Sequence, residues 1–385
     1  MRTSILIMFH CKQDTGYAIS SLEKAFKQAA TEAGFSEENI LWSYKEVADK
    51  EPQAFQLDYY SENDAMNLRN IIEEYQISTI LAFDLPYPSP VVRAARAMNV
   101  EKVVAYWGAS MSSINSGLKL FLRRFQWILQ ARSAPDFFIF ESNAMLRTAT
   151  HGRGVPKSRT TVIPLGVNTD TYYPDPHDRS AYRLFNIPET RKIIFYSGHM
   201  EERKGVRVLI NAMLELEKRK KLEPFHLLIC GNKGNQSEPY ESMLQSSQAL
   251  EHVTFAGYRK DVPQLMRSAY IGTIASTGWD SFTMSSVEML SSGLPLIVSE
   301  LQGLKETIDD GVCGYSFPPG NSEILASLWQ RYLDDPKLHH RHSKAARLRA
   351  VTNFSIAKQV ERIGQTLSTE FCYQESLHMP KEGHQ

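Results

Sequence analysis

Residues 271–290 read IGTIASTGWDSFTMSSVEML, and this stretch decides the fold class. Its first five residues are small or apolar and three of them are β-branched, which predicts a buried strand over residues 271–275. A short polar loop follows, and a segment with helical spacing of apolar residues begins near Thr283. A strand that passes through a short loop into a helix is the repeating unit of a parallel α/β sheet.

The same alternation of short apolar runs and helical segments extends through both halves of the chain. We expect strands over residues 4–9, 79–83, 103–106 and 137–140, and again over 192–197, 226–230, 253–256, 296–299 and 314–317. Helices are expected over 19–33, 89–98, 118–132 and 142–149, from Lys204, Val262 and Thr283 onward, and between Ser322 and about Phe371. The sequence therefore predicts two doubly wound α/β domains.

A linker is expected where this periodicity stops, between residues 162 and 176. Prolines and glycine gather there, at Pro164, Gly166, Pro174 and Pro176. We place an N-terminal domain at 1–170, a second domain at 171–355, and a last helix with a disordered polar tail at 356–385. Ligands bind at the carboxyl edges of parallel strands, so the cleft between the two domains is the expected site.

The composition argues against several classes of protein, namely nucleic-acid-binding, zinc-binding, disulfide-rich and membrane-spanning proteins. The 385 residues include 43 basic and 43 acidic side chains, so no net field attracts nucleic acid. The cysteines lie far apart without a CxxC pair, which argues against a zinc site and a disulfide framework and favours a reduced, cytoplasmic setting; they are Cys11, Cys230, Cys313 and Cys372. No signal sequence and no run of about 20 apolar residues is found, so we expect a protein that is at most peripheral to a membrane.

The segment Ser197-Gly198-His199-Met200-Glu201-Glu202-Arg203-Lys204-Gly205 is a candidate phosphate site. It leaves a predicted strand and starts a helix, so backbone amides and the helix dipole favour an anion there. Arg203 and Lys204 add the full positive charges that a departing diphosphate requires. The alternative is a charged surface turn, since charged residues open many helices.

A second segment, residues 276–288, brings two carboxylates around a strand–loop–helix turn. Asp280 is predicted to lie on the loop, and Glu288 about one turn into the helix. Carboxylate oxygens accept hydrogen bonds from adjacent hydroxyl groups, as sugars and ribose present them. Residues at the helix start would face the phosphates through their backbone amides and complete the candidate donor site; these are Ser281, Phe282, Thr283 and Met284.

These segments resemble glycosyltransferase family 4, the glycosyl transferases group 1, which have the GT-B fold and are retaining glycosyltransferases. The resemblance covers about residues 135–320 and rests on the linker VIPLGVN at 162–168, the 198–205 turn, and residues 226–231, 253–258 and 280–295. It implies two Rossmann-like domains that face a cleft, with the acceptor on the N-terminal domain, the sugar nucleotide on the C-terminal domain, and the C-terminal helices returning to the N-terminal domain.

The resemblance also implies roles for residues of the second half. The family's motif of two acids separated by seven residues binds the donor sugar with the first acid and the ribose with the second, here Asp280 and Glu288. Lys204 would bind the diphosphate, and Tyr258 would lie by the nucleobase. His199, beside Gly198, stands where the family usually carries arginine, which leaves more of the phosphate charge to Lys204 and Arg203.

Two positions of the first half depart from the family pattern. The family opens with a glycine-containing loop near the donor phosphates, and here Asp14-Thr15-Gly16-Tyr17 supplies the single Gly16. The family also places a histidine, followed by glycine, against the donor sugar, and the corresponding residues here are Trp107 and Gly108. A tryptophan cannot act as acid or base but can stack on a sugar ring; the alternative is a core tryptophan at a strand end. If Trp107 replaces that histidine, a pentose or 6-deoxy sugar donor is a further expectation.

These inferences predict a retaining glycosyltransferase that moves a sugar from a nucleotide-sugar donor to a hydroxyl acceptor. Lys204, Asp280 and Arg203 are the expected catalytic residues, with the donor phosphate assisting deprotonation and no metal ion or other cofactor required. Two rivals remain open. One is a GT-B sugar-nucleotide epimerase or phosphorylase, and the other is a catalytically silent relative that binds a nucleotide or a partner protein.

Residues 118–129, LKLFLRRFQWIL, combine apolar residues at helical spacing with basic residues between them. Such a helix can lie on an anionic membrane at the inner face of the cell boundary. The alternative is a helix that packs its apolar face on its own sheet. No oligomeric state follows from the sequence.

Overall fold

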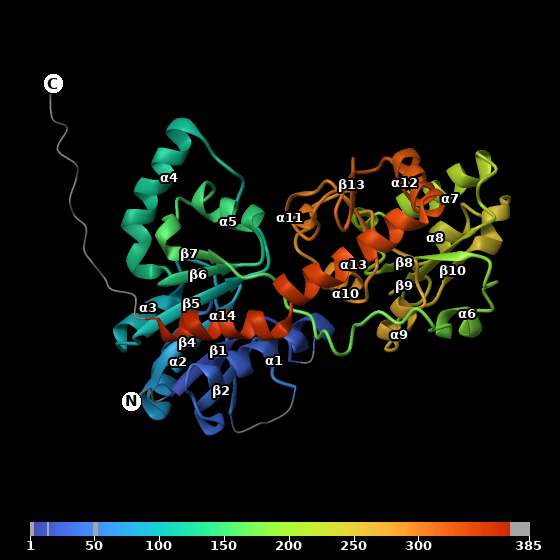
Figure 1. Cartoon of the computed structure of the whole chain (residues 1–385). Helices are drawn as coiled ribbons and strands as arrows, with labels where there is room; N and C mark the ends of the chain where they lie inside the picture. The colour runs from blue at the N-terminus through green and yellow to red at the C-terminus, as the bar shows by residue number, and fades with distance from the viewer. Residues whose placement is uncertain (1–3, 14, 49–52, 370–385) are drawn as a thin grey trace.

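The computed structural model describes residues 4–13, 15–48 and 53–369, and it contains two parallel sheets flanked by helices (Figure 1). The predicted disordered tail, Cys372 and Asp14 lie outside the described residues. The first sheet has seven strands in the order β3-β2-β1-β4-β5-β6-β7, and the second has six in the order β10-β9-β8-β11-β12-β13. Every pairing is parallel. The expected pair of doubly wound α/β units is confirmed.

The first sheet and its helices take up the N-terminal half. The strands are β1 (Ser4–Met8), β2 (Ile40–Tyr44), β3 (Ala54–Gln56), β4 (Ile77–Phe83), β5 (Lys102–Trp107), β6 (Phe137–Phe140) and β7 (Thr160–Val162). The helices are α1 (Tyr17–Glu32), α2 (Glu62–Tyr75), α3 (Pro90–Ala97), α4 (Gly117–Gln130) and α5 (Asn143–Thr150). The sequence prediction missed β2, β3 and β7. β3 and β7 have only three residues each, and β2 is a short apolar run that periodicity alone does not distinguish from part of a helix.

The second sheet repeats this plan. Its strands are β8 (Lys192–Ser197), β9 (Phe225–Cys230), β10 (Val253–Phe255), β11 (Ile271–Ile274), β12 (Leu296–Ser299) and β13 (Gly314–Phe317). Its helices are α6 (Ser180–Leu184), α7 (Val206–Lys218), α8 (Glu238–Glu241), α9 (Val262–Arg267), α10 (Met284–Ser291), α11 (Gln302–Lys305), α12 (Ser322–Asp334) and α13 (Pro336–Asn353). Central strands such as β9, β11 and β12 are buried along their whole length, as expected for a parallel sheet covered on both faces.

The chain ends by returning to the first half, as expected from the resemblance. Helix α14 (Ile356–Ser368) leaves α13 and runs along the first sheet beside α1 (Figure 1). Its Gln359 accepts a hydrogen bond from the Gly166 amide at 3.0 Å, and Lys102 donates one to the Leu367 carbonyl at 2.7 Å. The first contact fixes the linker against the last helix and the second fixes β5 against it, so the last helix is anchored to the first half.

The strand order places the functional loops. In each sheet the order reverses next to the first strand, between β1 and β4 and between β8 and β11. At such a switch point, neighbouring strands send their connections to opposite faces and leave a crevice at the carboxyl edge. The loop after β8 holds the predicted phosphate turn, and the loop after β11 holds Asp280. Both predicted segments therefore meet at one crevice.

Candidate functional site

Lys204 and Asp280 form the centre of the site. The Lys204 ammonium lies 2.9 Å from Asp280 Oδ1, and both side chains are largely buried. Ser276, which the sequence reasoning did not single out, donates a hydrogen bond of 2.6 Å to the other carboxylate oxygen. Gly205 makes this approach possible: its φ is +76°, and a Cβ there would lie 1.7 Å from the Ala275 carbonyl oxygen.

Arg203 lies at the rim of the site. Its guanidinium donates to the Trp279 carbonyl at 2.8 Å and pairs with Glu201 at 2.7 Å, while much of the side chain stays exposed. His199 is exposed beside Gly198, and its carbonyl accepts a hydrogen bond from the Tyr196 hydroxyl. Arg203 and His199 can therefore reach a ligand only at the mouth of the crevice.

Helix α10 directs its N-terminus at the same crevice. Thr283 caps the helix by accepting a hydrogen bond from the Ser286 amide. Ser281 is buried, and its hydroxyl has no hydrogen-bond partner among the described residues. The Phe282 ring packs edge-on against Phe354 at 5.0 Å between centroids, and Met284 packs on the same core. Phe282 and Met284 can therefore serve a ligand through backbone groups and not through their side chains.

Glu288 lies on α10 in an unexpected environment. It is only 4 % exposed, and its Oε1 has no hydrogen-bond partner in the part of the chain that the structure describes. Burial raises the pKa of the Glu288 carboxyl from 4.5 to about 7, although hydrogen bonds from the Tyr172 and Tyr17 hydroxyls favour the ionised form. Tyr172 belongs to the linker and Tyr17 to the start of α1. No sequence motif connects these tyrosines to Glu288, because only the tertiary structure brings the three segments together.

The N-terminal domain contributes the loop after β1 and the end of β5. Gly16 is the N-cap of α1 with a φ of +130°, and it precedes Tyr17, which is 52 % exposed. Trp107 ends β5; it is half-buried and packs partly on the core, and its buried indole Nε1 has no hydrogen-bond partner within residues 4–13, 15–48 and 53–369. A role in the core, the alternative reading of Trp107, therefore explains the packing of part of its ring but not its unpaired N–H group.

Tyr258 lies apart from these residues, in the loop after β10. Its ring is 57 % exposed, and the Lys233 ammonium lies 5.0 Å from the ring centroid. An exposed aromatic face beside a cation is suited to stacking on a planar base. Asp280 thus contacts both Lys204 and Ser281, whereas Tyr258 lies in another loop, beside Lys233.

The two domains also touch across the crevice. Glu306, at the end of α11, accepts hydrogen bonds from the Asn143 and Ala144 amides at 2.8 and 2.7 Å. These amides open helix α5, so the carboxylate also interacts favourably with the helix dipole. This contact holds the carboxyl edges of the two sheets near each other.

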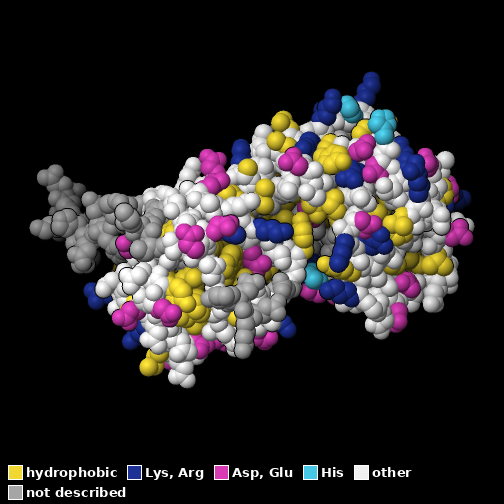
Figure 2. All heavy atoms as spheres, turned by 90° about the horizontal axis from the view of Figure 1, so that it is seen from below, with side chains coloured by type: hydrophobic (Ala, Val, Ile, Leu, Met, Phe, Trp, Pro, Cys, Tyr) yellow, Lys and Arg dark blue, Asp and Glu magenta, His cyan; other side chains and the backbone are white. Residues whose placement is uncertain are grey.

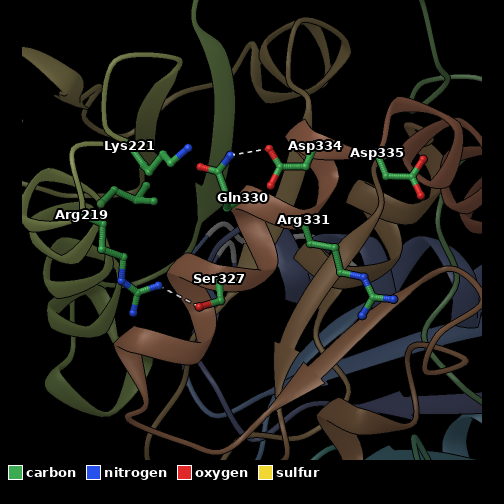
Figure 3. A pocket seen from close by; sticks show the side chains of 8 residues that line it. Arg219, Lys221, Ser327, Gln330, Arg331, Asp334 and Asp335 are labelled. Atoms are coloured by element: carbon green, nitrogen blue, oxygen red, sulfur yellow. Dashed lines mark hydrogen bonds between the residues drawn. The ribbon is translucent and has the colours of Figure 1, made fainter.

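Other surfaces are less suited to binding. A cavity of about 360 Å³ lies between the end of α7 and α12, and four of its polar side chains form two hydrogen-bonded pairs, Arg219 with Ser327 and Gln330 with Asp334 (Figure 3). Figure 2 shows acidic and basic side chains interspersed over both lobes, in keeping with the balanced charge. Among the described residues, no cluster of His, Cys, Asp or Glu is arranged to hold a metal ion. Within the same ranges, no helix is long and apolar enough to cross a bilayer.

Two family models match the chain. Residues 182–349 match the model described as glycosyl transferases group 1, and residues 43–171 match glycosyltransferase family 4. A phosphatidyl-myo-inositol mannosyltransferase of Mycobacterium leprae is 30% identical over 213 residues, which is 54% of each chain. A lipopolysaccharide 1,2-N-acetylglucosaminetransferase of Salmonella typhimurium is 25% identical over 50% of this chain and 52% of that protein. The chain thus matches these curated relatives over about half of their length.

Solved structures share the fold over nearly the whole chain. A glycosyltransferase from Rickettsia africae has a TM-score of 0.80 at 17% identity and covers 95% of this chain and 98% of its own. Anabaena HepE in complex with UDP-glucose has a TM-score of 0.71 at 18% identity, covering 94% and 99%. These likenesses establish the GT-B arrangement of the two domains.

Proposed function

Because the two matched models place the chain in glycosyltransferase family 4, we propose that it transfers a sugar from a nucleotide-sugar donor to a hydroxyl group of an acceptor. The acceptor class is a glycan, a lipid-linked saccharide or a small molecule. One observation carries this proposal: Lys204 and Asp280 form a buried ion pair at the switch point, beside the N-terminus of α10.

The ion pair suggests how the donor is recognised. In the free protein the Lys204 charge is balanced by Asp280 at 2.9 Å. A diphosphate at the start of α10 would draw the ammonium toward its own oxygens, since the helix amides also favour an anion there. Asp280, kept in place by Ser276, would then be free to accept hydrogen bonds from sugar hydroxyls. Diphosphate binding and sugar binding are coupled in this scheme.

We further propose that the reaction retains the anomeric configuration and needs no metal ion. Lys204, Arg203 and the α10 N-terminus together supply positive charge where the diphosphate leaves. The acceptor hydroxyl would attack on the face that the nucleotide vacates, and the departing phosphate would take its proton. Proton NMR of the product's anomeric centre tests retention, and unchanged turnover after treatment with EDTA tests metal independence.

The choice of donor is tested by a screen. HepE was solved with UDP-glucose, and the Mycobacterium relative is a mannosyltransferase, so UDP-glucose and GDP-mannose are the first donors to supply, with ADP- and dTDP-sugars beside them. We expect one of them to raise the melting temperature and to be consumed when an acceptor is present. A pentose or 6-deoxy sugar donor remains the prediction that follows from Trp107, and clear preference for an ordinary hexose would remove it.

The same screen separates the rival functions. Stabilisation by a nucleotide sugar without turnover in the presence of hydroxyl acceptors would support the silent relative. Conversion of the sugar without transfer to an acceptor would support an epimerase, and cleavage by inorganic phosphate would support a phosphorylase. The pair Asp280 and Glu288 together with Lys204 favours an active enzyme over the silent relative, because the charged residues expected to bind the sugar, the ribose and the departing diphosphate are all present.

Helix α4 supports a proposal about the acceptor. Its apolar side chains point away from the protein: only Trp127 is buried, while the exposed set is Leu118, Phe121, Leu122, Phe125, Ile128 and Leu129. The alternative that this helix packs its apolar face on its own sheet is therefore wrong. Every charged residue of the helix is basic, namely Lys119, Arg123 and Arg124. We propose that α4 rests on an anionic lipid surface and brings the site to a lipid-linked acceptor.

Vesicle binding tests this surface. The full chain should sediment with vesicles that contain phosphatidylglycerol, less with pure phosphatidylcholine, and less at high salt. A variant with Phe121→Ser, Phe125→Ser and Leu129→Ser should lose this binding, whereas Leu348→Ser, at an exposed leucine of α13, should keep it. Equal binding by both variants would overturn the proposal, as would a wild-type chain that dimerises through α4 and ignores vesicles.

A further inference from the structure

Two acidic side chains outside the predicted site lie at the carboxyl edge of the first sheet. Asp84 follows β4 and Glu141 follows β6, the strands on either side of β5. Gly108 follows β5, so it lies between Asp84 and Glu141 along the sheet edge. Three neighbouring strands thus end in Asp84, Gly108 and Glu141 at the edge that faces the second domain.

Gly108 holds the two acids together. Its amide donates a hydrogen bond of 2.9 Å to Asp84 Oδ1, and Asp84 adopts the left-handed conformation with a φ of +51°. A Cβ at Gly108 would lie 2.9 Å from Glu141 Oε1, so the glycine leaves room for the second carboxyl group. Strained backbone at a non-glycine residue often marks a functional position.

Neither acid is neutralised by a cation. Glu141 is 5 % exposed, and within the described residues it has no side-chain hydrogen bond and no ion pair. Burial and the nearby Asp84 raise the pKa of the Glu141 carboxyl well above its usual range. Burial raises the pKa of Asp84 to about 6, despite the backbone hydrogen bonds from Gly108 and Ala109. Glu141 therefore offers an unused proton donor next to an acceptor.

The segment that carries Glu141 approaches the second domain. Ser142 directly follows Glu141, and its hydroxyl oxygen is 2.6 Å from the position of a Cβ at Gly303 of the second domain. The same position lies 3.0 Å from the Oγ of Ser281, a residue that is 8 % exposed and whose hydroxyl has no hydrogen-bond partner among the residues that the structure describes. Ser281 adjoins Asp280 in sequence. The loop after β6, which carries Glu141, therefore lies close to the loop after β11, which carries Asp280.

We propose that Glu141 and Asp84 bind a hydroxyl group of the sugar carried by the nucleotide donor, with Glu141 donating and Asp84 accepting the hydrogen bond. This inference rests on the proposed function. A sugar hydroxyl both donates and accepts, so it satisfies a protonated and an ionised carboxyl group at the same time. A diphosphate does not fit here, because the site lacks a positive charge and holds an acid. Glu141 and Asp84 would then select the sugar, whereas Lys204 binds the phosphates.

A purely structural role explains the pair poorly. Buried acids stabilise a fold only when they are paired or hydrogen-bonded, and Glu141 joins no other element through its side chain. The aromatic side chains beneath the pair, Tyr106 and Tyr59, direct their hydroxyls elsewhere, to the carbonyls of Ile163 and Met8. Removing the acid should therefore leave the fold intact, which makes a binding test possible.

The test compares Glu141→Leu with Glu141→Gln. Leucine removes the polar group at similar size, and glutamine keeps a neutral donor. Calorimetry measures binding of the UDP-, GDP-, ADP- and dTDP-sugars of the donor screen, and of the matching nucleoside diphosphates, to each full-length protein. For the nucleotide sugar that the wild type prefers, we expect Glu141→Leu to lose affinity tenfold or more and Glu141→Gln to stay within about threefold. Binding of the matching nucleoside diphosphate should not change in either variant.

Each other outcome overturns the inference in a distinct way. Wild-type affinity of Glu141→Leu for the nucleotide sugar would show that the acids do not touch the donor sugar. An equal loss for the diphosphate alone would indicate a general disturbance of the crevice. Normal donor binding with a raised KM for a hydroxyl acceptor would assign the pair to the acceptor instead. If the wild type binds none of these nucleotides, the donor site itself fails and the inference fails with it.

Discussion

The buried carboxyl group of Glu288 makes a quantitative prediction for Glu288→Gln. The difference in pKa between 4.5 and about 7 corresponds to about 3 kcal/mol, since one pKa unit is worth about 1.4 kcal/mol. The folded state retains the proton more strongly than the unfolded state, so wild-type stability falls as the pH rises from about 4.5 through about 7. Glutamine avoids the buried charge and still accepts hydrogen bonds from Tyr17 and Tyr172. The variant should therefore be up to about 3 kcal/mol more stable than wild type at pH 8.

Urea denaturation of the free protein at pH 5 and pH 8 measures this effect. We expect the advantage of Glu288→Gln to be large at pH 8 and mostly absent at pH 5. Glu73→Gln, at an exposed position of α2, is the control and should show no such difference. The gain in stability should come with weaker nucleotide binding, since an amide accepts through one oxygen only. An advantage of the same size at both pH values would refute the reasoning, because it would not depend on ionisation.

Three further changes test the rest of the site. Lys204→Ala should lower kcat by about 10²- to 10³-fold with an unchanged circular dichroism spectrum, and near-normal turnover would remove Lys204 from the mechanism. Gly205→Ala should reduce both stability and turnover, because its Cβ would meet the Ala275 carbonyl at 1.7 Å; thermal melts and initial rates check this, and wild-type values for both would contradict it. Glu306→Ala should weaken the contact between the second domain and the α5 N-terminus by about 1 kcal/mol. Small-angle scattering of the free protein should then show a larger radius of gyration. An unchanged radius would mean that other contacts hold the domains together.

Much of the fold follows from local patterns. The alternation of apolar runs and helical segments predicts both sheets, and the polar turns at 198–205 and 276–288 follow strands that flank the second switch point. The edge strands β3 and β7 and their inner neighbour β2 are missed, because a run of three to five residues has little periodicity of its own. The exposed face of α4 also escapes it, since an amphipathic pattern does not say whether the apolar side faces the core or a membrane.

The sequence by itself determined the two doubly wound domains, the phosphate turn with Lys204 and the pair Asp280 and Glu288, because each depends on residues that are close along the chain. Only the tertiary structure decided what surrounds them. Tyr17 and Tyr172 reach Glu288 from two distant segments, and Glu141 meets Asp84 across three neighbouring strands. Burial and the charges nearby set the protonation of these acids, and both are properties of the folded chain that no local motif encodes.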